Sequence, residues 1–335
     1  MKKIKLAIVG ATGLVGENIL ALLSESKLEI ESVYLLASAS SVGEMLEFRR
    51  RSYEVEDLAQ FDFSQADYAI FSAGKAIAEK YVPRAAKQGC VVIDNSSQFR
   101  YDADVPLIIP EINGALLKEQ SFKIIANPNC STIQMLMALK PIYDAVGIKA
   151  IQVATYQSVS GHGREGLAEL ATQTANLLNA RGSEPGVFPK QIAFNVIPQI
   201  DTFEDNGHTR EEMKMVWETQ KIFEDDKLKV NATAVRVPVF YGHALAIHLE
   251  TKKKITAEQA RTRLDAFPGV EVLDQRVNGG YPTPVSDASG KNPVFLGRIR
   301  ENLACRYGIN LWVVADNLRK GAALNAIQIL ELMAQ

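Results

Sequence analysis

Residues 6–16 read LAIVGATGLVG, an apolar run followed by a turn that carries Gly10, Gly13 and Gly16. The short uninterrupted run is typical of a strand buried on both faces of a parallel sheet. Apolar residues on one side of a helical pattern follow, between residues 19 and 23. Glycines at such a turn let the backbone approach a pyrophosphate, which the N-terminus of the helix can bind. The stretch predicts a dinucleotide-binding loop. A glycine-rich turn without a ligand is the alternative.

Similar apolar runs continue along the first 130 residues, at 33–36, 68–71, 90–93 and 124–126, with a helix pattern over 76–88. Strands that alternate with helices indicate βαβ units and a parallel sheet. The sequence therefore predicts the α/β class, with a Rossmann-like nucleotide-binding domain made of residues 1–129 and a C-terminal helix within 316–335.

The character of the chain changes after about residue 150. Longer segments there alternate polar and apolar residues, which is typical of a mixed or antiparallel sheet. We expect strands at 151–156, 232–237 and 244–249, and helices at 161–181, 252–267 and 320–333. Residues 130–315 are accordingly predicted to form an α+β domain with a mixed sheet.

Composition narrows the class of protein. A chain of 335 residues is long enough for two domains, and a net charge of −2 gives no reason to expect nucleic acid or an anionic membrane as a partner. Three widely spaced cysteines fit neither a disulfide framework nor a metal site, and they favour a reducing compartment. No window approaches the ~18 apolar residues of a membrane span. We expect a cytoplasmic protein without a metal.

Cys130 is the candidate nucleophile, because it follows a short apolar run and precedes an apolar helix pattern. A thiolate at a helix N-terminus is stabilised by the dipole and the amide groups there. A buried structural cysteine is the alternative, which suits Cys90 and Cys305 better. His243 is the candidate acid or base, since imidazole can move a proton near neutral pH. The pattern alone does not rank His243 firmly above the other histidines.

The second predicted strand ends in residues 37–41, ASASS, and no carboxylate occurs before Glu44. An NAD site usually places a carboxylate there to hold the ribose hydroxyls. Small hydroxyl side chains leave room for a 2′-phosphate, so NADP is expected, with NAD as the weaker alternative. The other interpretation is a loop without any role in specificity.

Six separated motifs resemble the bacterial branch of the aspartate-semialdehyde dehydrogenase family, in the same order and across essentially the whole chain. They lie at residues 10–16, at 94–97 with the following Phe99-Arg100, and at 127–131, 156–161, 195–201 and 316–321.

The resemblance implies a role for each matching residue. Cys130 would be the acyl-accepting nucleophile, Gln157 would orient the substrate, and His243 would be the acid/base group. The residues implied in binding substrate or phosphate are Arg100, Asn129, Glu211, Lys214 and Arg236. Those implied in binding the cofactor are Gly10, Thr12, Gly13, Leu14, Val15, Ser38, Ser40, Ser41, Ser72, Gly74, Ser160, Gly161 and Asn317.

The family's reaction would be the reversible, NADPH-dependent reductive dephosphorylation of L-aspartyl 4-phosphate to L-aspartate 4-semialdehyde, through a thioester. Its small-molecule partners would be aspartyl phosphate, aspartate semialdehyde and phosphate, and the second domain would be catalytic and would form a homodimer. The alternatives are an N-acetylglutamyl-phosphate reductase and a catalytically silent nucleotide-binding paralogue. The chain departs from the family where Ser40 replaces a frequent arginine and Glu44 a frequent lysine; residues 49–51, three arginines, are candidates to compensate.

Overall fold

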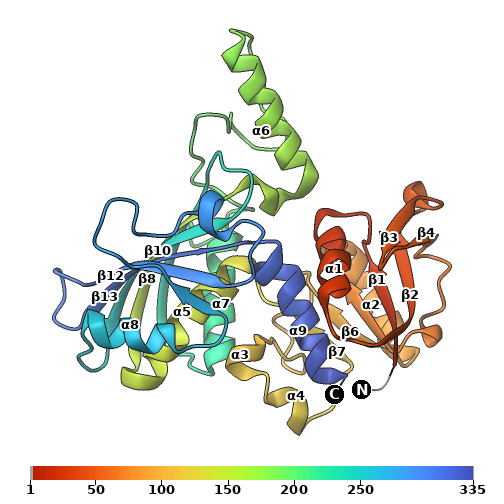
Figure 1. The fold of residues 1–335 in the computed structure, drawn as a ribbon, viewed down its shortest axis with the longest axis horizontal. Helices are drawn as coiled ribbons and strands as arrows, with labels where there is room; N and C mark the ends of the chain where they lie inside the picture. Colours follow the sequence, from red (N-terminus) through yellow and green to blue (C-terminus); the bar gives the residue numbers. More distant parts are fainter. Residues whose placement is uncertain (1–2, 335) are drawn as a thin grey trace. The chain divides into compact units, whose positions relative to one another are not determined.

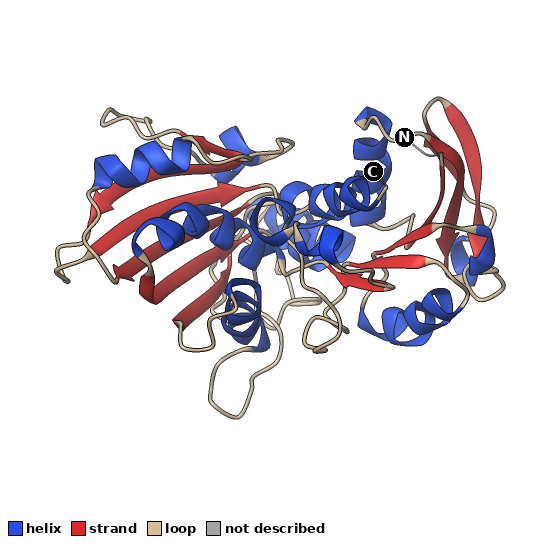
Figure 2. Ribbon diagram, turned by 90° about the horizontal axis from the view of Figure 1, so that it is seen from below, coloured by secondary structure: helices blue, strands red, loops and turns tan. Residues whose placement is uncertain are grey.

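The structure is a computed structural model that describes residues 3–334, and these divide into two compact units. One unit contains the residues up to Asn129 together with those from Ala322 onward, and the other is Cys130–Gly321. Residues 316–321, which the sequence-based division assigned to the first domain, group with the second unit. Each unit has a sheet of its own (Figures 1 and 2).

The first unit is built on a seven-stranded sheet in the order β3-β4-β2-β1-β5-β6-β7. All neighbouring strands are parallel except β3 and β4, which form an antiparallel hairpin at one edge. Its strands are β1 Ile4–Val9, β2 Ile30–Ala37, β3 Met45–Phe48, β4 Arg51–Asp57, β5 Tyr68–Phe71, β6 Val91–Asp94 and β7 Ile124–Ala126. Its helices are α1 Leu14–Glu25, α2 Lys75–Lys87, α3 Pro110–Asn113, α4 Leu116–Glu119 and α9 Leu324–Met333.

Both faces of this sheet are buried, as the uninterrupted apolar runs predict. Leu6 and Ile8 of β1 pack in one core cluster with residues of α1 and α9, whereas Ala7 and Val9 pack in a second cluster with residues of α2. Helices on both sides of a parallel sheet define a doubly wound α/β domain, in which ligands bind beyond the carboxyl ends of the strands.

The second unit contains a six-stranded mixed sheet in the order β11-β12-β13-β10-β8-β9. The strands are β8 Ile148–Gln157, β9 Lys229–Arg236, β10 His243–Thr251, β11 Val270–Val272, β12 Val294–Glu301 and β13 Gly308–Ala315. The helices are α5 Cys130–Val146, α6 Gly163–Leu178, α7 Arg210–Phe223 and α8 Ala257–Asp265. The fold class predicted from the sequence is confirmed, with a parallel sheet in one unit and a mixed sheet in the other.

One face of the mixed sheet is covered by helices. In β8, Ile151, Val153 and Thr155 are buried, whereas Gln152 and Tyr156, which point to the other face, are exposed. Helices α5, α7 and α8 pack against the strands on the covered side, and the opposite face carries the Tyr156–Trp312 aromatic pair. The alternation of polar and apolar residues in the sequence predicted a mixed or antiparallel sheet, and it matches this half-covered arrangement.

Several predictions need correction. The helix predicted over residues 320–333 begins with a π-helical turn, Arg319–Ala323, and becomes α-helical from Leu324. The helix predicted over 252–267 is limited to α8. Strands β3, β4, β11, β12 and β13 were not predicted.

Candidate active site

The glycine loop is built at the carboxyl end of β1. Gly10 has a φ of 81°, and a Cβ there would lie 2.9 Å from the carbonyl oxygen of Ser72. A Cβ on Gly16 would lie 2.2 Å from the carbonyl oxygen of Gly10. Side chains are thus excluded at both positions. The N-cap of α1 is Gly13, whose lack of a side chain leaves the first-turn N–H groups for a ligand. This geometry fits a pyrophosphate.

The predicted cofactor residues of the first unit gather at the carboxyl ends of three neighbouring strands. Thr12, Gly13, Leu14 and Val15 belong to the loop and first turn of α1. Ser72 follows β5, and its N–H donates to the carbonyl of Val9 at 2.9 Å. The remaining residues follow β2 or precede α2: Ser38, Ser40, Ser41 and Gly74.

The serines after β2 form an exposed 3-10 turn, in which the hydroxyls of Ser38 and Ser40 lie 2.9 Å apart. Arg49 does not compensate for the missing arginine, because its Nη2 donates to three carbonyls near the end of α1, those of Leu23, Ser26 and Leu28. Arg49 and Arg50 form the tip of the β3–β4 hairpin. The length of β3, ~13 Å, separates this tip from the start of the strand.

The candidate catalytic residues all belong to the second unit, where strand register brings them to one end of the sheet. Gln157 ends β8 and pairs with Arg236, which ends the parallel strand β9. β10 runs antiparallel to β8, with Ala244 opposite Tyr156, so His243 begins β10 at the same end. His243 also pairs with Ala315, the last residue of β13, two positions before Asn317.

Cys130 is the first residue of α5, as predicted, and it is partly buried. The π-helical turn packs closely against it, because a Cβ on Gly321 would lie 2.8 Å from the Cβ of Cys130. Asp316 stabilises this turn: Oδ1 accepts hydrogen bonds from the N–H groups of Leu318 and Arg319 at 2.8 and 3.1 Å. The motif at 316–321 therefore forms the surface that packs against Cys130.

Polar contacts run from the first turn of α5 to that of α7. Gln157 Nε2 donates to Ser131 Oγ at 2.7 Å and to Glu211 Oε1 at 3.2 Å. Glu211 Oε2 in turn lies 3.0 Å from Lys214 Nζ, and that ammonium group also contacts Asp201 Oδ2 at 2.8 Å. The pKa of Lys214 is raised, because the two carboxylates outweigh the lowering effect of burial.

Helix α7 is fixed by a capping box. The Thr209 side chain accepts from the N–H of Glu212, and Glu212 Oε2 accepts from the N–H of Thr209 at 2.7 Å. The other oxygen of Glu212 accepts from the N–H of Ala234 in β9 at 2.9 Å. Glu212 therefore sets the position from which Glu211 and Lys214 reach into the site.

Arg236 and His243 are buried side by side with the loop that follows β8. Arg236 Nη1 donates to the carbonyl of Ser158 at 2.9 Å, and the N–H of Ser158 donates to His243 Nδ1 at 3.1 Å. Because Nδ1 accepts, the neutral ring carries its proton on Nε2, which has no hydrogen-bond partner among residues 3–334. Burial, then the charge of Arg236, lowers the pKa of His243 to about 3.

Arg236 also interacts electrostatically with Cys130, the candidate nucleophile. Burial lowers the pKa of Arg236, whereas the charges of Glu211 and Cys130 raise it. A Cβ on Gly161 would lie 2.8 Å from Arg236 Nη1 and 3.4 Å from His243 Nε2. The glycine thus leaves open the space in front of both side chains.

Asn317, which is predicted to contact the cofactor, is the centre of an internal hydrogen-bond network. Its Oδ1 accepts from the hydroxyls of Ser158 and Ser160 at 3.1 Å each and from the N–H of Gly242 at 3.0 Å. The side chain therefore ties the loop after β8 to the turn before His243. A direct contact of Asn317 or Ser160 with a cofactor stays a prediction.

Arg100 and Asn129 belong to the first unit, and both are buried. Arg100 Nη2 donates to the carbonyl of Asn95 at 2.9 Å. Four contributors to the site were not singled out from the sequence: Ser131, Ser158, Asp201 and Gly321. All four lie within motifs that resemble the family, so the sequence marked these positions but did not indicate a role for them.

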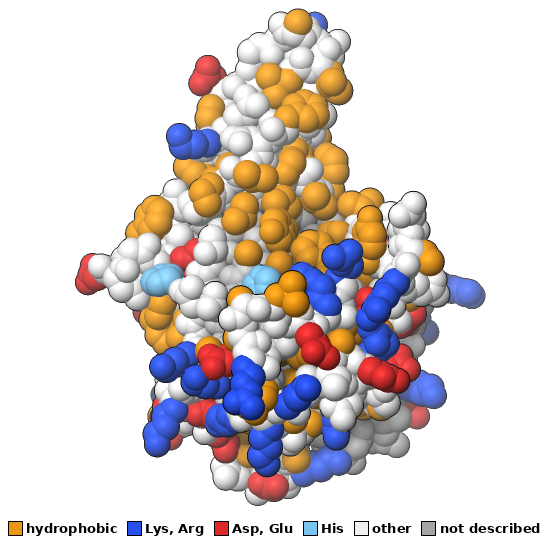
Figure 3. Space-filling view, turned by 90° about the vertical axis from the view of Figure 1, so that its left-hand side faces the viewer, with side chains coloured by type: hydrophobic (Ala, Val, Ile, Leu, Met, Phe, Trp, Pro, Cys, Tyr) orange, Lys and Arg blue, Asp and Glu red, His pale blue; other side chains and the backbone are white. Residues whose placement is uncertain are grey.

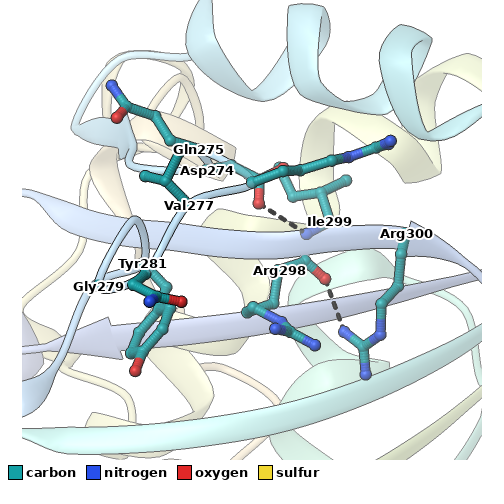
Figure 4. Close-up of a pocket in the computed structure, with 10 residues that line it drawn as sticks. Asp274, Gln275, Val277, Gly279, Tyr281, Arg298, Ile299 and Arg300 are labelled. Carbon is teal, nitrogen blue, oxygen red and sulfur yellow. Dashed lines mark hydrogen bonds between the residues drawn. The ribbon is translucent and has the colours of Figure 1, made fainter.

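A cavity of about 610 Å³ lies elsewhere in the second unit, between the loop that precedes β12 and β12 itself (Figure 4). Asp274, Tyr281, Arg298 and Arg300 are among its lining residues, and Arg300 Nη1 donates to the carbonyl of Arg298 at 2.6 Å. The cavity contains none of the predicted site residues. Within the described part of the chain, no group of His, Cys, Asp and Glu side chains is arranged to hold a metal ion.

The first unit is doubly wound and carries a glycine loop, and the second has a mixed sheet and a cysteine at the start of a helix. Together these features define a dinucleotide-dependent dehydrogenase. Comparison with known proteins agrees. Residues 5–120 match the family model "Semialdehyde dehydrogenase, NAD binding domain", and residues 139–320 match "Semialdehyde dehydrogenase, dimerisation domain".

Curated relatives match over nearly the full length. The aspartate-semialdehyde dehydrogenase of Legionella pneumophila is 56% identical over 99% of this chain and 96% of its own. A crystal structure of aspartate semialdehyde dehydrogenase II from Vibrio cholerae, complexed with ASA, is 54% identical with a TM-score of 0.97, covering 99% of this chain and 98% of that one. The Candida albicans enzyme, whose structure is with NADP, is 26% identical with a TM-score of 0.77, covering 99% and 98%.

The chain belongs to the aspartate-semialdehyde dehydrogenase family. It is thus an oxidoreductase of amino-acid biosynthesis with an NAD(P)-binding domain. Among residues 3–334, no helix has the length and apolar character that crossing a membrane requires.

Proposed function

We propose that this enzyme converts L-aspartyl 4-phosphate and NADPH, with a proton, into L-aspartate 4-semialdehyde, phosphate and NADP⁺, and that the reaction is reversible. The product would supply the synthesis of lysine (through diaminopimelate), threonine, methionine and isoleucine. The observation that carries the proposal is the register of the mixed sheet, which gathers Gln157, Arg236 and His243 at one end.

Cys130 is proposed to attack the acyl carbon, forming a C–S bond while the bond to the phosphate oxygen breaks. The resulting thioester divides one difficult reaction into two easier steps. The helix N-terminus supports the thiolate, and so does the charge of Arg236, which interacts with Cys130. When bound, the reduced nicotinamide supplies the hydride that the thioester carbon requires.

His243 is proposed to act through Nε2. In the tautomer that Ser158 selects, Nε2 carries a proton and has no partner among the described residues. This N–H can donate a hydrogen bond to an oxyanion of the tetrahedral intermediate. As that intermediate collapses, the C–S bond breaks and the aldehyde forms. A neutral donor suits a site in which Arg236 already supplies a positive charge.

The charged side chains match an amino acid that carries an acyl phosphate. The buried Arg236 fork suits the α-carboxylate, and the Glu211 carboxylate suits the α-ammonium group. Lys214 and Arg100 would bind the phosphate, and Asn129 adjoins the nucleophile in sequence. Gln157, which donates to both Ser131 and Glu211, would hold the acyl group between them.

NADP is proposed as the preferred cofactor. The glycine loop fits the pyrophosphate, and the exposed hydroxyls of Ser38 and Ser40 can donate to a 2′-phosphate. Hydrogen bonds to a charged group contribute about 1.5–3 kcal/mol each. With a serine in place of the family's arginine, the preference over NAD should be modest.

A homodimer formed through the second unit is also proposed. Large apolar side chains are exposed there, among them Leu178 (74%), Phe194 (67%) and Phe203 (61%). Figure 3 shows hydrophobic side chains gathered over the upper part of one face, while charged side chains predominate below them. Contiguous apolar surface of this kind marks interaction sites. Sedimentation equilibrium tests this proposal, and a monomer at micromolar concentration would contradict it.

The activity is tested by following NADP⁺ reduction in the presence of aspartate semialdehyde and phosphate, with the acetylglutamyl analogue as the competing substrate. Cys130→Ser should bind NADP⁺ normally and lose turnover by about three orders of magnitude or more, because an alkoxide forms far less readily than a thiolate. Cys305→Ser is the matched control and should retain activity. Near-normal turnover by Cys130→Ser would refute the thioester mechanism.

A further inference from the structure

The segment 195–201 contacts two of the charged residues proposed to bind substrate or phosphate. Ile197 exchanges two backbone hydrogen bonds with Arg236, of 2.9 and 2.8 Å, in an isolated antiparallel bridge. Four residues further on, Asp201 Oδ2 lies 2.8 Å from Lys214 Nζ. One short segment thus fixes the backbone of Arg236 and the ammonium group of Lys214.

Asp201 is built into this position. Its φ of 70° lies in the left-handed region, which aspartate tolerates better than most residues do. Its Oδ1 accepts from the N–H of Thr202 at 2.9 Å, and the carbonyl of Thr202 accepts from the N–H of Arg210 at 2.7 Å. Arg210 begins α7, so the carboxylate of Asp201 has a fixed place relative to the helix that carries Lys214.

Lys214 is mostly buried, with 13% of its side chain exposed, and lies between two carboxylates. Glu211 is the partner that the α-ammonium group of the substrate would engage. Asp201 has no proposed contact with the substrate, so its carboxylate remains paired with Lys214. Burial by itself would raise the pKa of Asp201, but the hydrogen bond and charge of Lys214 outweigh this effect and lower it.

We infer that Asp201 is a positioning residue that sets the affinity for phosphate. It holds the Lys214 ammonium group in place and cancels part of its charge. The inference rests on the proposed function, in which Lys214 binds phosphate. The two effects oppose each other: orientation favours phosphate binding, whereas the negative charge of Asp201 disfavours it. Two substitutions separate them.

Asp201→Asn keeps the size, the tolerance of a left-handed backbone and an oxygen that accepts from Lys214, but removes the charge. The KM for phosphate should fall by about three- to tenfold in semialdehyde oxidation, with the KM for the semialdehyde within about twofold of the parent value. Asp201→Gly keeps the left-handed turn and removes the acceptor as well. Its KM for phosphate should exceed that of Asp201→Asn by at least about threefold.

Asp205→Asn is the matched control, since Asp205 is exposed in the same loop. Its phosphate KM should equal that of the parent protein. A phosphate KM unchanged in Asp201→Asn would overturn the inference, and so would a proportional change in both KM values, which indicates a general structural role. If the parent enzyme itself shows no phosphate-dependent oxidation of the semialdehyde, the proposed function fails instead. Parent activity with unaltered variants refutes the role of Asp201 alone.

Discussion

His243 is expected to remain neutral in the folded enzyme at a pH where an ordinary histidine is protonated. Its ring is fully buried, Nδ1 accepts from the N–H of Ser158, and Arg236 adds a positive charge nearby. Burial and that charge both oppose protonation, and they lower the pKa from 6.5 to about 3. The perturbation that tests this expectation is acidification of the enzyme from pH 8 to pH 5.

The size of the effect follows from the two pKa values. At pH 5.5 a histidine with a pKa of 6.5 is ~90% protonated, whereas His243 with a pKa of about 3 would be less than ~1% protonated. The folded-state pKa lies below that of the unfolded chain, so the unfolded chain binds the extra proton. Stability is therefore fully present above pH 6.5 and declines as the pH falls from 6.5 towards 3, by ~1.4 kcal/mol per pH unit.

NMR of enzyme labelled in the histidine rings measures this directly. The His243 signal is assigned by its loss in His243→Asn, a variant whose side-chain oxygen can still accept from Ser158. That signal should stay constant between pH 8 and pH 5 and should report a proton on Nε2. A His243 signal with a midpoint between pH 6 and 7 would refute the reasoning and restore an imidazolium to the mechanism.

Two further substitutions test the site. Gly161→Ala should lower kcat/KM by about tenfold or more, because the new Cβ would lie 2.8 Å from Arg236 Nη1 and would displace that side chain or the His243 ring. Gly182→Ala is the control, because a Cβ at Gly182 has nothing within 4 Å, and equal activity of the two variants would contradict the close contact. Ser40→Arg should widen the preference for NADP by lowering its KM and leaving that for NAD unchanged, since an arginine pairs with the 2′-phosphate; an unchanged ratio of kcat/KM between the two cofactors would show that this turn does not contact the phosphate.

The first unit could be predicted from the sequence because its signals are local. A buried strand, three glycines and an amphipathic helix occupy residues 6–25 without interruption. The β3–β4 hairpin escaped prediction for an equally local reason: residues 45–57 are mostly polar and exposed, with Phe48 and Val55 as the buried apolar exceptions. In β12 the apolar run is broken by Gly297 and by an irregularity between Gly297 and Arg300.

The candidate site was predictable as a set of residues, mainly through the family resemblance, but its contacts were not. His243 and Ser158 are 85 positions apart, and they meet because β10 pairs with β8 in one particular register. The contact between Asp201 and Lys214 depends on a left-handed backbone at a residue other than glycine, for which the sequence has no marker. Arg49 was expected near a phosphate because of its charge, but its guanidinium group binds carbonyl oxygens instead.

The charged residues around His243 explain why its protonation state could not be inferred from the residue type alone. Lys214 lies between the carboxylates of Glu211 and Asp201, whose charges raise its pKa, and the hydrogen bond and charge of Lys214 lower the pKa of Asp201. A protonated His243 would add a positive charge to a buried ring next to Arg236, and the fold makes that unfavourable. In the proposed mechanism, Arg236 and the helix N-terminus would balance a thiolate at Cys130, and His243 would donate from Nε2. The sequence supplies a histidine suited to acid/base work, and its surroundings restrict it to the neutral form.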